Sequence, residues 1–242
     1  MRLRGRLVGP LAILVFSLGL LLGMAIFGGL IWSDFETLFF DPAWRYETPL
    51  RSLRCPVMLT TGETGVVSVR VSNPLDRPTE RYLRISMTAG SILQVMEFTE
   101  VVVLEPGEAA RVRWAVTPDD AVYGRFIMVN AVLRPRYGLP ARQSSCGIIV
   151  VDVPYLTGHQ VFGLALGVSL VTMAAGYVLW IKADPPLGVR RRQMARAMMA
   201  LAGGVVAGIV IGFLGLWLLG LILFLIVLIA IGVTIGYFLE RA

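Results

Sequence analysis

The side chains that could carry out catalysis or bind a metal are few and scattered along this chain. His159 is the single histidine, and no cysteine cluster accompanies it, so a zinc or haem site lacks its usual ligands. A Ser-His-Asp triad would have to use His159, and no serine-containing nucleophile motif is present. Five acidic residues match no calcium-loop spacing and are expected to lie in solvated turns: Glu63, Glu105, Glu108, Asp119 and Asp120. We therefore predict no catalytic residue, no metal and no cofactor, and expect a protein that is not an enzyme.

Three long runs without any charged residue determine the rest of the architecture. They contain 27, 29 and 43 residues: Leu7–Ser33, Val153–Ile181 and Ala197–Leu239. About 20 helical residues cross a lipid core of about 30 Å, and a single helix over the last run would reach about 64 Å. That run is therefore predicted to form two helices that reverse at Gly215–Gly220. The four predicted transmembrane helices are Leu7–Trp32, Leu156–Ile181, Ala197–Leu214 and Leu219–Leu239. Because no Asp, Glu, Lys or Arg lies within them, a pump or transporter built from this chain alone is not expected.

The basic residues between and beside these spans predict the orientation. By the positive-inside rule, the cytoplasmic, lipid-facing basic residues are Arg2, Arg4, Arg6, Lys182, Arg190, Arg191, Arg192 and Arg196. Residues 33–158, with 13 Arg, no Lys and 14 acidic residues, are then exported, and the N- and C-termini lie in the cytoplasm. The excess positive charge faces anionic lipid headgroups, so nucleic acid is not an expected partner. The alternative of a cleaved signal peptide for the first span is disfavoured by the length of its apolar run.

The exported segment has the pattern of short strands separated by turns. Val67, Val69 and Val71 alternate with polar residues, and two further runs do the same: Leu83, Ile85 and Met87, then Val112, Trp114 and Val116. This period of two places apolar groups on one face and arginines on the other. About seven strands in about 100 residues are typical of a two-sheet β-sandwich.

Two stretches within this segment resemble a known type of module. Gly62–Pro74 (GETGVVSVRVSNP) and Leu104–Glu108 (LEPGE) are similar to the immunoglobulin-like modules of bacterial surface proteins, of the CARDB and NEW3 kind. The resemblance covers residues 55–152 and none of the spans. It implies adhesion, spacing or protein contact, and it supplies no functional residues.

Cys55 and Cys146 are the only cysteines, and they stand near the first and last strands of the exported segment. An oxidising compartment permits a disulfide between them, and two free thiols are the alternative. We predict the disulfide, which would close a loop of about 90 residues.

Glycines recur at four-residue spacing in every predicted span. They are Gly19, Gly23, Gly163, Gly167, Gly204, Gly208, Gly212, Gly232 and Gly236. This spacing lets helix backbones approach closely, either within this protein's own bundle or against another membrane subunit. Packing within the bundle is the preferred interpretation.

The sequence thus predicts an α plus β membrane protein: four transmembrane helices with an exported immunoglobulin-like β-sandwich between the first and second. The expected segments are the N-terminus and first helix (1–33), an interfacial aromatic linker (34–54), the β-sandwich (55–152), the second helix (153–181), a basic cytoplasmic loop (182–196), and a helical hairpin with a short C-terminus (197–242). We expect a non-enzymatic scaffold or accessory subunit of the bacterial plasma membrane that contacts other membrane or envelope proteins. The alternative is a membrane component of a transport or export assembly whose catalytic residues lie on another chain.

Overall fold

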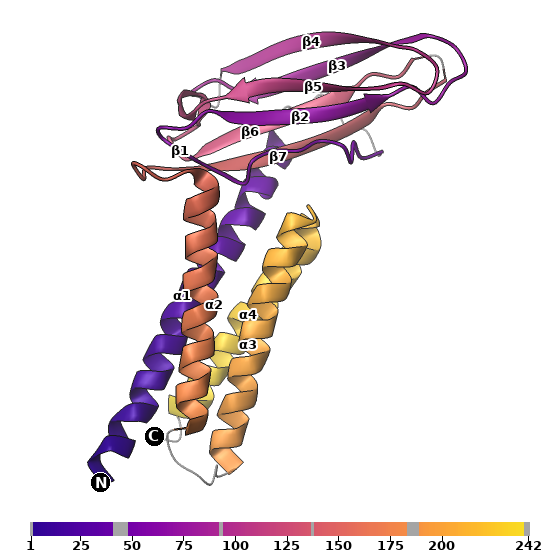
Figure 1. Cartoon of the computed structure of the whole chain (residues 1–242). Helices are drawn as coiled ribbons and strands as arrows, with labels where there is room; N and C mark the ends of the chain where they lie inside the picture. The colour runs from indigo at the N-terminus through magenta and orange to yellow at the C-terminus, as the bar shows by residue number, and fades with distance from the viewer. Residues whose placement is uncertain (1, 41–47, 92–93, 137, 183–188, 240–242) are drawn as a thin grey trace. The chain divides into compact units, whose positions relative to one another are not determined.

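A computed structural model describes residues 2–40, 48–91, 94–136, 138–182 and 189–239 of the 242-residue chain (Figure 1). It divides into two compact units. The first, called here the helical unit, comprises Met1–Ile31 and Phe162–Ala242, and the second, called the β unit, comprises Trp32–Val161. The helices are α1 (Arg2–Phe39), α2 (Gly158–Lys182), α3 (Val189–Phe213) and α4 (Trp217–Leu239). The fold is therefore α plus β.

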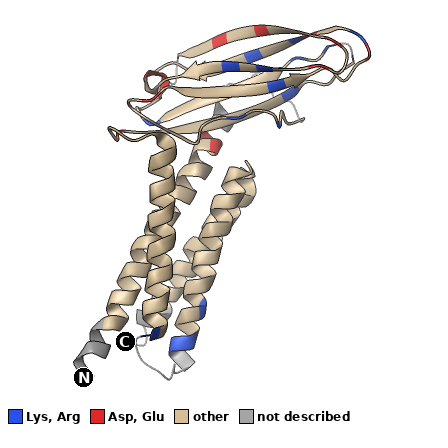
Figure 2. Ribbon diagram, in the orientation of Figure 1, with Lys and Arg blue, Asp and Glu red and all other residues tan. Residues whose placement is uncertain are grey.

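All four helices are long and apolar enough to cross a membrane. The qualifying stretches have mean hydropathies between 1.9 and 3.2 and are Val8–Thr37, Gly158–Lys182, Arg191–Phe213 and Trp217–Gly236. Among the residues of the helical unit whose side chains are described, charged residues occur only at the ends of α2 and α3 (Figure 2). The prediction of four membrane-length apolar helices is confirmed.

Several helix ends differ from the predicted span limits. α1 continues to Phe39, so the beginning of the predicted linker at Asp34 is helical, and α3 begins at Val189, within the predicted basic loop. The reversal after α3 lies at Leu214–Leu216, because Gly215 adopts a φ of 69° and Leu216 N donates to Ile211 O at 3.3 Å, which ends the helix. Gly220, predicted as part of the turn, lies inside α4.

The helices of the helical unit pack through small residues and interlocking rings. Ser169 of α2 is fully buried, and its hydroxyl donates to the Gly19 carbonyl of α1 at 2.8 Å. Phe27 of α1 meets Phe224 of α4 edge to face, with ring centroids 5.3 Å apart. Such close contacts replace the hydrophobic effect as the source of helix association in lipid.

The β unit contains seven strands in the described residues, arranged in two sheets (Figure 1). The strands are β1 (Met58–Thr60), β2 (Gly65–Ser72), β3 (Thr79–Thr88), β4 (Val95–Leu104), β5 (Ala109–Val116), β6 (Phe126–Leu133) and β7 (Arg142–Val151), with a short 3-10 helix at Pro118–Asp120. One sheet has the order β1-β7-β6-β3-β4, and the other pairs β2 with β5. All pairings are antiparallel except β1 with β7.

The two-residue alternation read from the sequence places the core between the two sheets. Val69 and Val71 of β2 pack with Leu83 and Ile85 of β3, and all four are at most 1% exposed. On β5 the alternation is looser, because Val116 is buried whereas Val112 and Trp114 are only partly buried. On β3, Arg84 lies on the face opposite Leu83 and Ile85, as the alternation predicts, but it is buried, and so is Arg81 on the same side as Leu83. Arg84 pairs with Glu97 of the neighbouring strand β4, and Arg81 lies on the core-facing side of β3.

Two glycines allow strands of the β unit to pack closely against the end of α1 and the start of α2, which belong to the same unit. A Cβ on Gly147 of β7 would lie 2.6 Å from the Cβ of Ser33 in α1, and one on Gly158 would meet the Met58 backbone of β1. Glu63 accepts a hydrogen bond from Gly158 N at 2.6 Å and so caps the first turn of α2.

Candidate functional site

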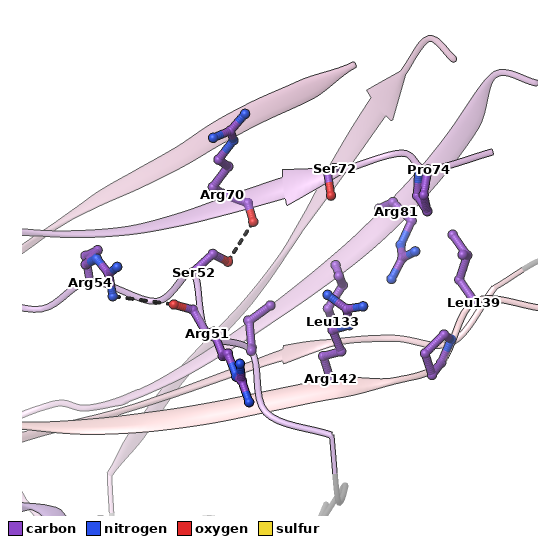
Figure 3. A pocket seen from close by; sticks show the side chains of 12 residues that line it. Arg51, Ser52, Arg54, Arg70, Ser72, Pro74, Arg81, Leu133, Leu139 and Arg142 are labelled. Atoms are coloured by element: carbon purple, nitrogen blue, oxygen red, sulfur yellow. Dashed lines mark hydrogen bonds between the residues drawn. The ribbon is translucent and has the colours of Figure 1, made fainter. Parts of the chain in front are cut away.

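The β unit contains a cavity of about 500 Å³ at the end of its core (Figure 3). This volume is within the range of small-molecule sites. The cavity is lined by the segment before β1, by β2, β3 and β6, and by the chain leading into β7. The lining residues are Leu50, Arg51, Ser52, Arg54, Arg70, Ser72, Pro74, Arg81, Leu133, Leu139, Pro140 and Arg142.

The strand pattern explains why a guanidinium reaches into this core. Arg81 lies on β3 two residues before Leu83, so it shares the core-facing side of the strand with Leu83 and Ile85. Its side chain therefore occupies a position that is apolar further along the same strand. Arg70 comes from β2, and Arg142 begins β7, so strands from both sheets bring arginines to one cavity.

Arg81 is the innermost charged group of the cavity. The residue is 3% exposed, and its Nε has no hydrogen-bond partner among the described residues. Burial, followed by the positive charge of Arg142, lowers the pKa of the Arg81 guanidinium. Leaving a buried charge without a partner is costly, which makes this position different from an ordinary surface arginine.

The other arginines of the cavity are exposed and form a positive rim: Arg51, Arg54, Arg70 and Arg142. Arg54 Nη1 lies 3.4 Å from the Arg51 carbonyl, and the Ser52 hydroxyl donates to the Arg70 carbonyl at 2.7 Å. No carboxylate lines the cavity or pairs with these five arginines in the described part of the chain. The arrangement can therefore attract and hold an anion.

Two arginines elsewhere in the β unit show the contrasting case. Arg84 forms a bidentate pair with Glu97 at 2.6 and 2.7 Å, and this contact lowers the pKa of the Glu97 carboxyl. Arg136 pairs with Glu80 at 3.0 Å and lies over the Tyr82 ring. Arg84 and Arg136 thus have acidic partners, whereas the arginines that line the cavity have none among the described residues.

Sequence reasoning missed this cavity. The predicted apolar face of β3 began at Leu83, and extending its period by one step toward the N-terminus would have placed Arg81 inward. The presence of 13 arginines and no lysine in residues 33–158 was a second signal, because guanidinium groups bind oxyanions through two parallel hydrogen bonds.

The predicted disulfide between Cys55 and Cys146 is confirmed. It joins the segment before β1 to β7, with the two Cα atoms 6.6 Å apart, and both residues pack against the core.

The structure brings some of the predicted glycines into helix contacts and leaves others open. A Cβ would collide with the side chain of Thr172 at Gly19, of Val205 at Gly23, of Val227 at Gly204 and of Phe27 at Gly208, and at Gly212 it would lie 3.3 Å from Leu30. No described atom lies within 4 Å of a Cβ placed on Gly163, Gly167, Gly232 or Gly236. The close contacts lie within the helical unit.

The basic and acidic residues identified from the sequence lie at element ends and turns. Lys182 ends α2, and Arg191, Arg192 and Arg196 lie in the first turns of α3, where Arg191 donates to the Trp180 carbonyl at 3.1 Å. The side chains of Arg2, Arg4, Arg6 and Arg190 lie outside the description. Asp120 and Glu108 accept hydrogen bonds from the backbone of their own turns, at Thr117 and Glu105. His159 is exposed at the start of α2, and the described residues contain no group of three His, Cys, Asp or Glu placed to hold a metal.

Comparison with known proteins assigns no family to this chain. No family model and no curated protein matches it. A cycloisomaltooligosaccharide glucanotransferase from Paenibacillus sp. is 12% identical over 44% of this chain and 14% of its own, with a TM-score of 0.33. A β-glucosidase from Listeria innocua is 17% identical over 41% of this chain and 15% of its own, with a TM-score of 0.31. The chain therefore spans a small part of either enzyme.

A third solved structure is a CARDB domain from Pyrococcus furiosus in complex with di-metal ions. It is 13% identical over 45% of this chain and all of its own, with a TM-score of 0.31. One weak structural neighbour is thus a CARDB domain. Similarity this low assigns neither an activity nor a ligand to the chain.

Proposed function

We propose that this chain is a non-enzymatic scaffold or accessory subunit of the bacterial plasma membrane. In this proposal, four transmembrane helices anchor an exported immunoglobulin-like β-sandwich, which recognises a partner outside the cell membrane. The observation that carries the proposal is one chain containing four membrane-length apolar helices and a disulfide-bonded β unit between α1 and α2.

Membrane insertion is supported by the surface of the helices. Large apolar side chains are more than half exposed on α1 and α4, including Leu18, Leu21, Ile229 and Val233. Exposing so many such groups to water would be unfavourable, whereas lipid chains solvate them without cost. The bilayer is therefore the expected surrounding of these faces.

The orientation is supported by the charges and the disulfide. Arg191, Arg192 and Arg196 follow the connection between α2 and α3, which suits a cytoplasmic loop at an anionic leaflet. Cys55 and Cys146 form a disulfide in the segment that connects the end of α1 to the start of α2, and disulfides persist outside the cytoplasm. Residues 33–158 are then exported.

The proposal includes no catalytic activity because several acidic residues of the β unit already accept structural hydrogen bonds. Glu63, Glu108 and Asp120 are engaged in capping and turn hydrogen bonds, so they are poorly placed for acid-base chemistry. The β unit then serves recognition, with the partner being another membrane or envelope subunit.

Reporter fusions test the orientation. A periplasmic reporter fused after Glu100 should be active and a cytoplasmic reporter inactive, while fusions after Gly188 should give the opposite result. An active periplasmic reporter after Gly188 would overturn the four-span arrangement. Mild-detergent purification followed by mass spectrometry should recover a stoichiometric membrane or envelope partner, and a monomeric protein without any partner would contradict the accessory role.

A further inference from the structure

We infer that the arginine-lined cavity of the β unit is a binding site for a phosphate ester, meaning an organic molecule that carries at least one doubly charged phosphate group. The site lies entirely within residues 50–142, so the inference goes beyond the proposed membrane function and does not depend on the orientation of the helices.

The residues that line the cavity indicate that its ligand is negatively charged. Five arginines line the cavity, the guanidinium groups of Arg81 and Arg142 are directed toward it, and no carboxylate lines it among the described residues (Figure 3). In the same unit, Arg84 and Arg136 have acidic partners at 2.6 and 3.0 Å. A cation would be repelled from this cavity, whereas an anion supplies the missing counter-charge.

Arg81 indicates that the site is built rather than incidental. Its side chain is directed into the cavity from a core-facing position and is almost fully buried, yet its Nε has no hydrogen-bond partner in the described chain. Because the side chain is almost fully buried, little side-chain entropy remains to be lost on binding. A bound oxyanion beside this guanidinium would supply the missing counter-charge and offset the cost of the buried charge.

The number of guanidinium groups favours a polyvalent anion over a single carboxylate. One carboxylate would neutralise only one of the two charges that Arg81 and Arg142 direct toward the cavity, whereas a phosphate carries about two negative charges and three acceptor oxygens at neutral pH. Arginine forks match the geometry of phosphate oxygens and can bind them in pairs.

The rest of the lining favours an organic body attached to the phosphate. A cavity of about 500 Å³ exceeds the space that a single phosphate needs, and Leu50, Leu133, Leu139 and Pro140 form an apolar part of its wall. Pockets that combine apolar walls with a few convergent polar groups are typical of small-molecule sites. The phosphate ester can come from a soluble metabolite or from a lipid headgroup.

Calorimetry and thermal melting of the full-length protein in neutral detergent test this site. The probes are inorganic pyrophosphate, for a soluble polyvalent phosphate, and dihexanoyl phosphatidic acid, for a lipid headgroup, with dihexanoyl phosphatidylcholine as the matched zwitterionic lipid. We expect pyrophosphate or phosphatidic acid to raise the melting temperature and phosphatidylcholine to leave it unchanged. Binding should weaken as salt concentration increases, because exposed rim charges are screened.

Variants separate this site from the general positive charge of the unit. Arg81→Met should weaken binding by about tenfold or more, since a charge-assisted hydrogen bond is lost, while the unliganded protein melts at the same or a higher temperature because a buried charge is removed. Arg142→Gln at the exposed rim should weaken binding without affecting folding. Arg113→Gln, an exposed arginine of β5 outside the cavity, is the control and should bind as the wild type does.

The outcomes are distinct. Stabilisation by pyrophosphate that depends on Arg81 and Arg142 supports a soluble polyvalent phosphate as the source, and stabilisation by phosphatidic acid alone with the same dependence supports a lipid source. No binding of either probe, or equal weakening by Arg113→Gln, would overturn the inference. Because these measurements use no membrane and no partner protein, their failure is independent of the topology and co-purification results.

Discussion

Two arginines on β3, Arg81 and Arg84, show how the surroundings decide what a residue does. Both are buried on one strand, but Arg84 shares its charge with Glu97, whereas Arg81 faces a cavity without a carboxylate. The same residue type therefore stabilises the sheet at one position and creates a binding surface at the other. A property of this kind depends on three-dimensional neighbours.

The Arg84–Glu97 pair predicts a dependence of stability on pH. The pKa of the Glu97 carboxyl is lowered, chiefly by its hydrogen bonds from Arg84, so the stabilisation is complete above the ordinary carboxyl pKa and is lost as the pH falls through the lowered value. We expect the Glu97→Gln variant to lose less than about 1 kcal/mol at neutral pH, because the carboxylate is nearly half exposed and screened by solvent. Denaturation curves between about pH 6 and pH 3 measure the difference.

Glu100→Gln on the same strand is the matched control, since Glu100 is exposed and has no ion pair in the described structure. Wild type and the Glu97→Gln variant should converge in stability at low pH, whereas the Glu100→Gln variant should follow the wild type throughout. A constant gap between wild type and the Glu97→Gln variant at every pH would contradict this account.

The residue-level predictions succeeded where few alternatives existed. With two cysteines in the chain, only one intramolecular disulfide is possible, and the structure confirms it. Arg81 was missed because its type indicates a surface position and only its register on β3 places it inside. Register is a property of strand pairing, which the local pattern near the end of a strand defines weakly.

At the scale of elements, apolar runs located all four helices but not their ends. Hydropathy marks where a chain can contact lipid, whereas a helix continues as long as its backbone hydrogen bonds do. α1 extends to Phe39 through polar residues, and Trp32 donates to Glu36 one turn later at 2.8 Å, which supports this extension. The same reasoning explains why α3 begins among arginines at Val189.

Glycine spacing identified helix contacts only in part, and this difference gives a paired test. Gly208→Leu on α3 would place its side chain against the Phe27 ring, which is held by Phe224, so the helices must separate. Overpacking of this kind typically costs about 1–3 kcal/mol, and the purified protein should melt at a lower temperature in detergent. A Cβ placed on Gly232 of α4 meets no described atom within 4 Å, so the Gly232→Leu variant should melt like the wild type.

Partner recovery distinguishes the two predicted roles of these glycines. If Gly232→Leu leaves the isolated protein stable but reduces co-purification of a partner, the open glycines form an external contact. Equal melting temperatures for Gly208→Leu and wild type would contradict packing of Gly208 within the helical unit.

At the scale of the whole molecule, the disulfide is expected to account for a large part of the stability of the β unit. It joins residues separated by 91 positions, and the loop-entropy model assigns about 4–5 kcal/mol to such a closure. A Cys55→Ser/Cys146→Ser variant should therefore unfold at lower denaturant concentration and be cleaved faster by protease within residues 55–152. Reductant should destabilise the wild type similarly and leave the variant unchanged, and a variant as stable as oxidised wild type would refute the prediction.

The parallel pairing of β1 with β7 determines the order in which the strands of the β unit can pair during synthesis. Met58 pairs with Ile149 and Thr60 with Val151, so the first strand to leave the ribosome must wait for the last one before it can join its sheet. β3 and β4 are adjacent in sequence and antiparallel, and they can zip together early, whereas closure across about 90 residues comes late and slowly. Until then the Cys55 thiol is available to other oxidants and partners. The β unit can therefore complete its larger sheet and form its disulfide only after β7 has been synthesised, and α2 begins seven residues later.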